Sequence, residues 1–263
     1  MRLIVLLLIT FNLYAERIVA LSPSITDILF ALGRGNEVVG VSNYTFYPQK
    51  ATTLPTVGGY FHPNIEKILS LQPSLIIAQP HHGEFLSQLS ALGIKTKVIV
   101  LESIDDIKKS IAELADSHTA KAKQLIADID NAIHRAKYTQ TNSTVIIVFG
   151  LFEDLSDNIY ISGQKLFFNE IIELCGAKNA FTSAVPQQPV LNYEDLIALN
   201  PHRVIILNGN NNPNAKKAIQ NWQKTPIKAA KDGAIRVLNH DFISLPSQRI
   251  NLSIDVICKA IND

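Results

Sequence analysis

Histidines and aromatic residues gather in three short loops within the first hundred residues of the chain. The histidines are His62, His81 and His82, and neutral imidazole is a common ligand of transition metals. Flat rings such as those of Tyr44 and Tyr60 suit stacking on a large planar ligand. These residues predict a binding site for a metal-containing small molecule, with the three histidines as candidate ligands of the metal, directly or through a bound chelate. The alternative is that they are exposed loop histidines without a ligand.

Two further recognition residues lie near the end of the chain. Asp241 and Phe242 directly follow a β-rich segment at 235–238, and ligands of open α/β sheets bind where the strands end. We therefore predict that Asp241 and Phe242 form a second rim of the binding site.

Short β-rich runs alternate with segments of helical periodicity, which predicts an α/β fold with parallel sheets covered on both faces. The predicted strands are 17–21, 38–42, 75–78, 97–101, 145–149, 204–207 and 235–238. The predicted helices are 25–32, 65–71, 85–92, 166–174, 193–199 and 250–261.

One longer element separates two halves of the chain. Apolar residues recur every three or four positions from Ile104 to Ile133, which predicts a single helix over 105–137. At about 1.5 Å per residue this helix is too long for a crossover inside one small α/β unit. We therefore expect it to join two Rossmann-like lobes, with a ligand cleft between them. The predicted division is an N-terminal lobe at 16–103, a connecting helix at 104–138 and a C-terminal lobe at 139–263.

The two halves share a motif. The segment NIEKILSLQP at 64–73 is matched 128 residues later by NYEDLIALNP at 192–201. Each copy is a helix with an acidic first turn that ends at a proline and leads into a β-rich run. The repeat favours two lobes of similar structure.

The first fifteen residues have the layout of a secretory signal peptide. Arg2 precedes an apolar run at 3–11, and the segment ends at Ala15, near which we expect cleavage. This run is shorter than the ~20 residues that span a bilayer, so we expect an exported protein. The chain has 24 Lys and Arg against 23 Asp and Glu, a balance that disfavours nucleic-acid binding.

The sequence carries no familiar enzyme signature. It contains no GxxxxGK[ST] loop, no GxSxG and no HExxH, so we expect a protein without catalytic activity or an intrinsic cofactor. An exported metal-dependent hydrolase that uses the loop histidines is the alternative. The two cysteines, Cys175 and Cys258, have no CxxC partner, which disfavours a thiolate zinc site. In an exported chain they form either a disulfide or two buried free thiols.

Several segments together resemble a known family. They are RIVALSPSITD at 17–27, VGVSNY at 39–44, NIE at 64–66 and LQPSLII at 71–77. These segments resemble those of the helical-backbone periplasmic substrate-binding proteins of ABC importers for cobalamin, haem and iron-siderophores. The similarity extends over nearly the whole chain. Within that family it resembles the vitamin B12-binding members most.

The resemblance implies roles for individual residues. Glu66 and Glu194 match the two lobe-surface glutamates with which such proteins dock on the membrane permease. Tyr44 matches a tyrosine that contacts the corrin, and Tyr60 stands where these proteins have a tryptophan in the cleft. Asp241 belongs to a segment that aligns with a ligand loop of the second lobe.

The resemblance also implies the pairing of the cysteines and the role of the whole protein. Cys175 and Cys258 match the cysteines of the family's disulfide. The chain is then expected to be a monomer of the periplasm that captures a corrinoid and delivers it to the permease. The alternative ligands are haem and a nickel or iron chelate, so that the ligand carries cobalt, iron or nickel.

Overall fold

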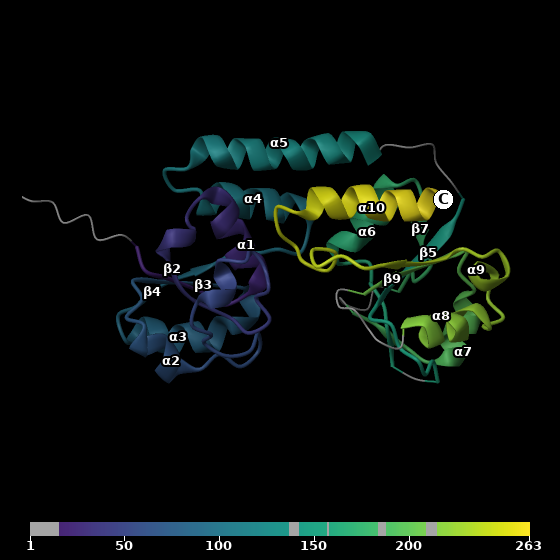
Figure 1. Cartoon of the computed structure of the whole chain (residues 1–263), viewed down its shortest axis with the longest axis horizontal. Helices are drawn as coiled ribbons and strands as arrows, with labels where there is room; N and C mark the ends of the chain where they lie inside the picture. The colour runs from purple at the N-terminus through teal and green to yellow at the C-terminus, as the bar shows by residue number, and fades with distance from the viewer. Residues whose placement is uncertain (1–15, 137–141, 157, 184–187, 209–214) are drawn as a thin grey trace, which may run out of the picture.

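The computed structural model describes residues 16–136, 142–156, 158–183, 188–208 and 215–263, which fold into two α/β lobes (Figure 1). The predicted leader at 1–15 lies outside the described residues. The predicted fold class, two lobes with parallel sheets, is confirmed.

The first lobe is built on a parallel sheet with the strand order β2-β1-β3-β4. Its strands are β1 (Ile18–Ala20), β2 (Val38–Val41), β3 (Leu75–Ala78) and β4 (Lys95–Val98). The central strand β1 is completely buried, as expected for a parallel strand with helices on both faces of its sheet. The edge strand β4 begins two residues before its predicted start, since its polar side chains reach solvent at the sheet edge and mask the apolar signal.

The second lobe repeats this topology. Its parallel sheet has the order β10-β9-β5-β7, and a short antiparallel ribbon of β6 and β8 lies beside it. These strands are β5 (Thr144–Phe149), β6 (Ile159–Tyr160), β7 (Lys178–Asn179), β8 (Val190–Leu191), β9 (Arg203–Leu207) and β10 (Ile235–Leu238). In chain order, the parallel strands of this lobe are β5, β7, β9 and β10. Across the sheet they lie in the order second, first, third, fourth, which is also the order β2-β1-β3-β4 of the first lobe. The motif repeat in the sequence is therefore a repeat of the fold.

Helices cover both sheets, and the six short helices predicted from periodicity are confirmed to within two residues at either end. The first lobe has α1 (Pro23–Leu32), α2 (Ile65–Ser70), α3 (Gly83–Ala91) and the 3₁₀ turns η1 (Gly35–Glu37), η2 (Ala51–Thr53) and η3 (Pro80–His82). The second lobe has α6 (Phe167–Leu174), α7 (Tyr193–Leu199), α8 (Ala215–Gln223), α9 (Lys228–Lys231) and α10 (Ile250–Asn262). Among the described residues, no helix combines the length and the apolar character that a membrane span requires.

A disulfide joins Cys175, at the end of α6, to Cys258 in α10. The bond confirms the pairing that the family resemblance implied, and it excludes the alternative of two free thiols. Both cysteines are buried in the core of the second lobe, where the covalent link fixes α10 against α6.

The prediction of one connecting helix is wrong, because the segment folds as two helices. They are α4 (Ile104–Leu114) and α5 (Thr119–Ala136), and between them Asp116 has a left-handed φ of 47°, through which no right-handed helix continues. The apolar spacing runs on across the break because Leu114 and Ala122 face the same core from either side of the turn.

Helix α5 contacts helices of both lobes, α1 in the first and α10 in the second. It runs back over α4 and then along α10 of the second lobe (Figure 1). Ile107 in α4 and Ile129 in α5 belong to one apolar cluster that also contains residues of α1 and α10. The lobes thus share a continuous core along this edge, which opposes wide separation.

Candidate functional site

Exposed aromatic side chains gather at the carboxyl ends of the strands in the first lobe. Tyr44 and Phe46 lie in the loop after β2, and their rings meet edge to face at 6.3 Å. Tyr44 is 73% exposed and has a left-handed φ of 65°, which holds it at the tip of the loop. Phe61, in the loop before α2, is 71% exposed. Exposed apolar surface of this kind is typical of a ligand or protein contact.

Tyr60, His81 and His82 form a second cluster in this lobe. The Tyr60 ring centroid lies 4.4 Å from that of His81, and the two histidine rings are 3.9 Å apart. The Tyr60 hydroxyl donates to Gln79 Oε1 at 2.6 Å, and burial raises its pKa. His82 Nε2 lies 2.7 Å from the Tyr60 carbonyl oxygen, so this nitrogen carries the proton and donates it. The three rings are in contact but tilted against one another, with angles of 40° to 80° between their planes.

The two adjacent histidines differ in accessibility. His82 is buried, and its Nδ1 has no hydrogen-bond partner among the described residues. His81 is exposed, and burial of part of its ring together with the charge of His82 lowers its pKa, although the hydrogen bond to the Tyr60 carbonyl acts in the opposite direction. His81 therefore presents a neutral imidazole at neutral pH.

The three predicted histidines do not form a joint metal site. Among the described residues, no group of three or more His, Cys, Asp or Glu side chains is placed to hold a metal ion. His62 is exposed on the same loop as Tyr60, whereas His81 and His82 turn toward the Tyr60 carbonyl. The loops bring the rings of His81 and His82 together, without a third metal ligand beside them among the described residues.

The second lobe contributes the loop that leads into α10. Asp241 in this loop is exposed, and Phe242 is partly buried with its ring stacked on His240 at 5.0 Å. Arg249, at the end of the loop, donates from Nη1 to Asp241 at 2.8 Å and from Nε to Asp27 of α1 at 2.7 Å. The loop therefore binds the first lobe directly at its base.

A cavity of about 240 Å³ lies between the lobes. Its lining residues are Pro23, Tyr44, Phe46 and Tyr47 of the first lobe and Asp241, Ser244, Leu245 and Arg249 of the second. Tyr44 and Asp241, which were predicted on opposite sides of a cleft, thus meet at one cavity. Tyr60, His81 and His82 do not line it.

Phe152 and Tyr160 of the second lobe were missed by the sequence reasoning. Their rings lie 6.2 Å apart beyond the carboxyl end of β5, and Tyr160 is partly exposed. The strand that carries Tyr160 has only two residues, too few for a recognisable alternation. They give this lobe an exposed aromatic surface.

Glu66 and Glu194 occupy equivalent positions in the two lobes. Each is exposed in the first turn of a helix, Glu66 in α2 and Glu194 in α7. Each stands two positions after the asparagine that caps its helix. Asn64 Oδ1 accepts from Lys67 N at 2.9 Å, and Asn192 Oδ1 accepts from Asp195 N at 2.8 Å. The same cap therefore fixes both glutamates on their lobes.

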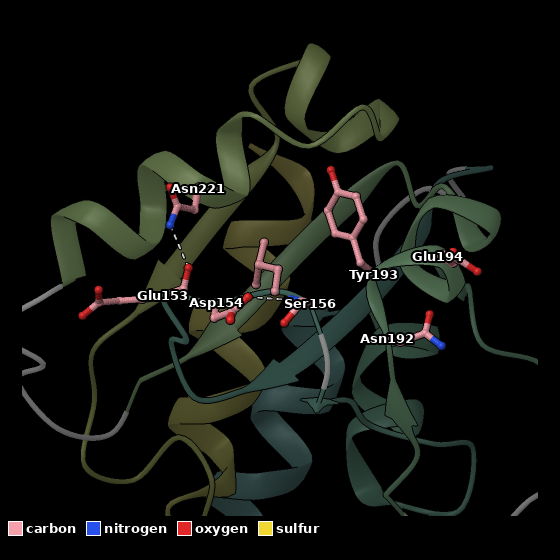
Figure 2. A pocket seen from close by; sticks show the side chains of 8 residues that line it. Glu153, Asp154, Ser156, Asn192, Tyr193, Glu194 and Asn221 are labelled. Atoms are coloured by element: carbon pink, nitrogen blue, oxygen red, sulfur yellow. Dashed lines mark hydrogen bonds between the residues drawn. The ribbon is translucent and has the colours of Figure 1, made fainter.

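A larger cavity, of about 660 Å³, opens beside Glu194 in the second lobe (Figure 2). Tyr193 and Asp154 face it, and Glu194 lies at its edge. Its residues all belong to the second lobe, so it is separate from the cavity between the lobes.

Comparison with known proteins places the chain among binding proteins. Residues 18–241 match the family described as periplasmic binding protein. The chain is 30% identical over 270 residues to the vitamin B12-binding protein of Vibrio vulnificus strain YJ016, an alignment that covers 97% of this chain and 94% of the relative.

Solved structures show the same two-lobe arrangement. The periplasmic vitamin B12-binding protein BtuF of Vibrio cholerae superposes with a TM-score of 0.79 at 26% identity, covering 94% of this chain and 97% of that chain. The periplasmic heme-binding protein RhuT from Roseiflexus sp. RS-1, in its apo form, gives 0.78 at 25% identity and covers 94% and 98%.

Proposed function

The chain belongs to the periplasmic binding protein family, whose members of this type are the solute-binding components of ABC importers, and we propose that its solute is a corrinoid. It would hold the corrinoid between its lobes and deliver it to a membrane permease. The relatives are binding proteins, and the proposal includes no catalytic activity and no intrinsic cofactor. The cobalt arrives with the solute.

The observation that carries the proposal is the cavity between the lobes. One of its walls consists of the rings of Tyr44, Phe46 and Tyr47, and the other is polar, with Asp241 and Arg249. A corrinoid combines a large flat ring with polar side groups, so an aromatic wall facing a polar one is complementary to it. The names of the relatives point to the same solute class.

Haem or a nickel or iron chelate is the second candidate solute. The observation that favours it is the pair of imidazoles at His81 and His82 beside the Tyr60 ring, with His62 on the neighbouring loop. An imidazole from one of these histidines would bind the metal of the chelate as a single ligand, which needs no three-histidine site.

Titration of the purified protein with cyanocobalamin, haemin and nickel–histidine distinguishes the two candidates. We expect cyanocobalamin to bind and the His81→Ala/His82→Ala variant to keep the affinity of the unmodified protein, because neither histidine lines the cavity between the lobes. Absorbance and the fluorescence of Trp222 and the tyrosines report binding. His134→Ala, at an exposed position of α5, is the matched control. The corrinoid would be rejected in favour of the second candidate by two results together. The unmodified protein would bind haemin or nickel–histidine but not cyanocobalamin, and the double histidine variant would lose that binding.

We further propose that Glu66 and Glu194 dock on the permease, one from each lobe. Both carboxylates are exposed and equivalently capped, and neither lines the cavity between the lobes. Basic side chains of the permease would pair with them across the interface.

The Glu66→Ala/Glu194→Ala variant is expected to lose most of its uptake activity while binding the solute with unchanged affinity. Uptake of radiolabelled solute by cells that carry the permease, together with the dissociation constant of the purified variant, measures the two effects separately. Glu84→Ala removes another exposed first-turn glutamate of the first lobe and should leave uptake unaltered. Normal uptake by the double variant would disprove the docking role.

The remaining parts of the proposal concern where the protein acts. Residues 1–15 would direct export and be removed near Ala15, leaving a monomer in the periplasm. The family's periplasmic members support this location.

A further inference from the structure

Positive charges are concentrated in one part of the second lobe. Residues 203–236 contain seven Lys and Arg residues and a single acidic residue, Asp232. Residues 139–263 as a whole contain eleven basic and eleven acidic residues. The second lobe is therefore neutral overall, and its charges are sorted by position rather than present in excess.

Four of these lysines form what we call the basic patch. They are Lys216 in α8, Lys224 directly after that helix, and Lys228 and Lys231 in α9. All four are exposed, and none has an ion-pair partner among the described residues. Helices α8 and α9 contact each other, and Trp222 buries the other side of α8 in the core. The patch is thus a continuous positive surface on two packed helices.

The first lobe has no such patch, although it has the same fold. The segment between the third and fourth parallel strands contains α3 in the first lobe and α8 with α9 in the second. In the first lobe this segment, 79–94, carries Glu84 and neither lysine nor arginine. The fold therefore does not require lysines at this place, and the basic patch distinguishes one lobe from the other.

The basic patch adjoins the proposed docking position of the second lobe. Helices α2 and α7, which carry Glu66 and Glu194, lie on the side of the molecule away from α5, and α8 lies near α7 on that side (Figure 1). Glu194 and Asn221 of α8 line the same cavity, together with Glu153 and Asp154 (Figure 2). Acidic side chains thus surround the docking position, and the unpaired lysines begin on the next helix along the same side.

An extended positive surface is complementary to an extended negative one. The four ammonium groups are spread over two helices, and none of these lysines lines either of the two cavities described above, so they do not converge on one small anion. A permease lies in a membrane, and a protein docked on it through Glu194 would hold α8 close to the surrounding lipid. Lysines near anionic lipid headgroups are attracted to them within about a Debye length.

We propose that the basic patch binds the anionic phospholipid headgroups of the membrane around the permease. The second lobe then contacts lipid and permease together, whereas the first lobe contacts the permease alone. This inference rests on the proposed function, because docking through Glu194 brings the patch to the membrane. The attraction to lipid itself needs no permease, and it would concentrate and orient the protein at the membrane surface before docking.

The test measures sedimentation of the purified protein with lipid vesicles. One kind of vesicle is pure phosphatidylcholine, and the other also contains about 40 mol% phosphatidylglycerol, which is anionic. We expect binding to the anionic vesicles only, and a decrease of about tenfold or more when NaCl is raised from about 0.05 M to about 0.5 M. Replacing all four lysines of the basic patch by glutamine should also weaken this binding about tenfold or more, since each lysine near such a surface strengthens it by about fivefold.

Two further variants separate the patch from net charge and from folding. The matched control replaces by glutamine four exposed lysines outside the patch that also lack ion-pair partners among the described residues, and it should keep most of the vesicle binding. These four are Lys50, Lys95, Lys121 and Lys123. Replacing the four patch lysines by arginine should preserve binding, because the charge is kept.

The outcomes distinguish failure of this inference from failure of the proposed function. Absence of binding to the anionic vesicles, equal binding to both kinds, or an equal loss in the two glutamine variants would overturn the lipid contact and leave the docking role untouched. The vesicles contain no permease, so Glu66→Ala/Glu194→Ala should bind them at least as well as the unmodified protein. If that variant also showed normal uptake, the docking role would fail while its vesicle binding still supported the lipid contact.

Discussion

Replacing Asp27 by alanine is expected to lower the free energy of unfolding by about 3–5 kcal/mol. The Asp27 carboxylate is buried in α1 and accepts hydrogen bonds from Ser247 Oγ, Gln248 Nε2 and Arg249 Nε, all from the second lobe. Its removal leaves three buried donors without their acceptor, and the guanidinium keeps only its bond to Asp241. Urea denaturation followed by circular dichroism measures the change.

A matched variant shows whether burial is the cause. Asp105→Ala breaks the exposed pair with Lys109 on α4, where solvent screens both charges, and we expect little change in stability. The Asp27→Ala/Arg249→Met variant should be more stable than Asp27→Ala alone, because it no longer buries an incompletely paired cation. A loss in Asp27→Ala as small as in the Asp105 variant would show that the contact between the lobes contributes little to the folded state.

Removal of the disulfide is the second change with a large expected effect. The bridge between Cys175 and Cys258 closes a separation of 83 residues, for which the chain-entropy treatment gives about 4–5 kcal/mol of stabilisation. We expect Cys175→Ala/Cys258→Ala to lose that amount in urea denaturation. Alanine is the suitable replacement because both positions are buried in the core, where serine hydroxyls would need partners.

Reduction provides the control for this variant. Dithiothreitol should shift the unfolding midpoint of the unmodified protein toward that of the double alanine variant and leave the variant itself unchanged. If the variant and the oxidised protein unfold at the same urea concentration, the bridge stabilises the native state much less than its loop length suggests.

Local sequence signals were sufficient for most of the fold. The β-branched runs at Ile18–Ala20 and Arg203–Leu207 predicted buried parallel strands, because a strand with helices on both sides needs apolar residues on both faces. The acidic first turn and the following proline of the repeated motif predicted α2 and α7, and in the structure an asparagine caps each of these helices.

The turn at Asp116 was not predictable from the same signals. The i, i+4 spacing from Leu114 through His118 to Ala122 is that of a continuous helix, and it arises here because α4 and α5 pack on one core. Only the left-handed backbone of Asp116 ends α4, and neither glycine nor proline marks the site.

The site was predictable in part, and the limit was set by sequence separation. Tyr44 and Asp241 were predicted because each follows a strand of its own lobe, where ligands of open α/β sheets bind, and both line the cavity between the lobes. The pairing of Asp27 with Arg249 joins residues 222 positions apart, and no local pattern indicates such a partner. The contact between the lobes at Arg249 therefore became visible only in three dimensions.

The shared asparagine cap of α2 and α7 has a mechanical consequence. It fixes the backbone that carries Glu66 and Glu194, one on each lobe. Rotation of one lobe against the other along α5 and α10 would therefore change the distance between these two positions and leave the helix start around each unchanged. The distance between the two glutamates therefore depends on the angle between the lobes. Under the proposed docking role, a permease that contacts both glutamates would distinguish the solute-bound protein from the empty one by this distance, without contact with the solute.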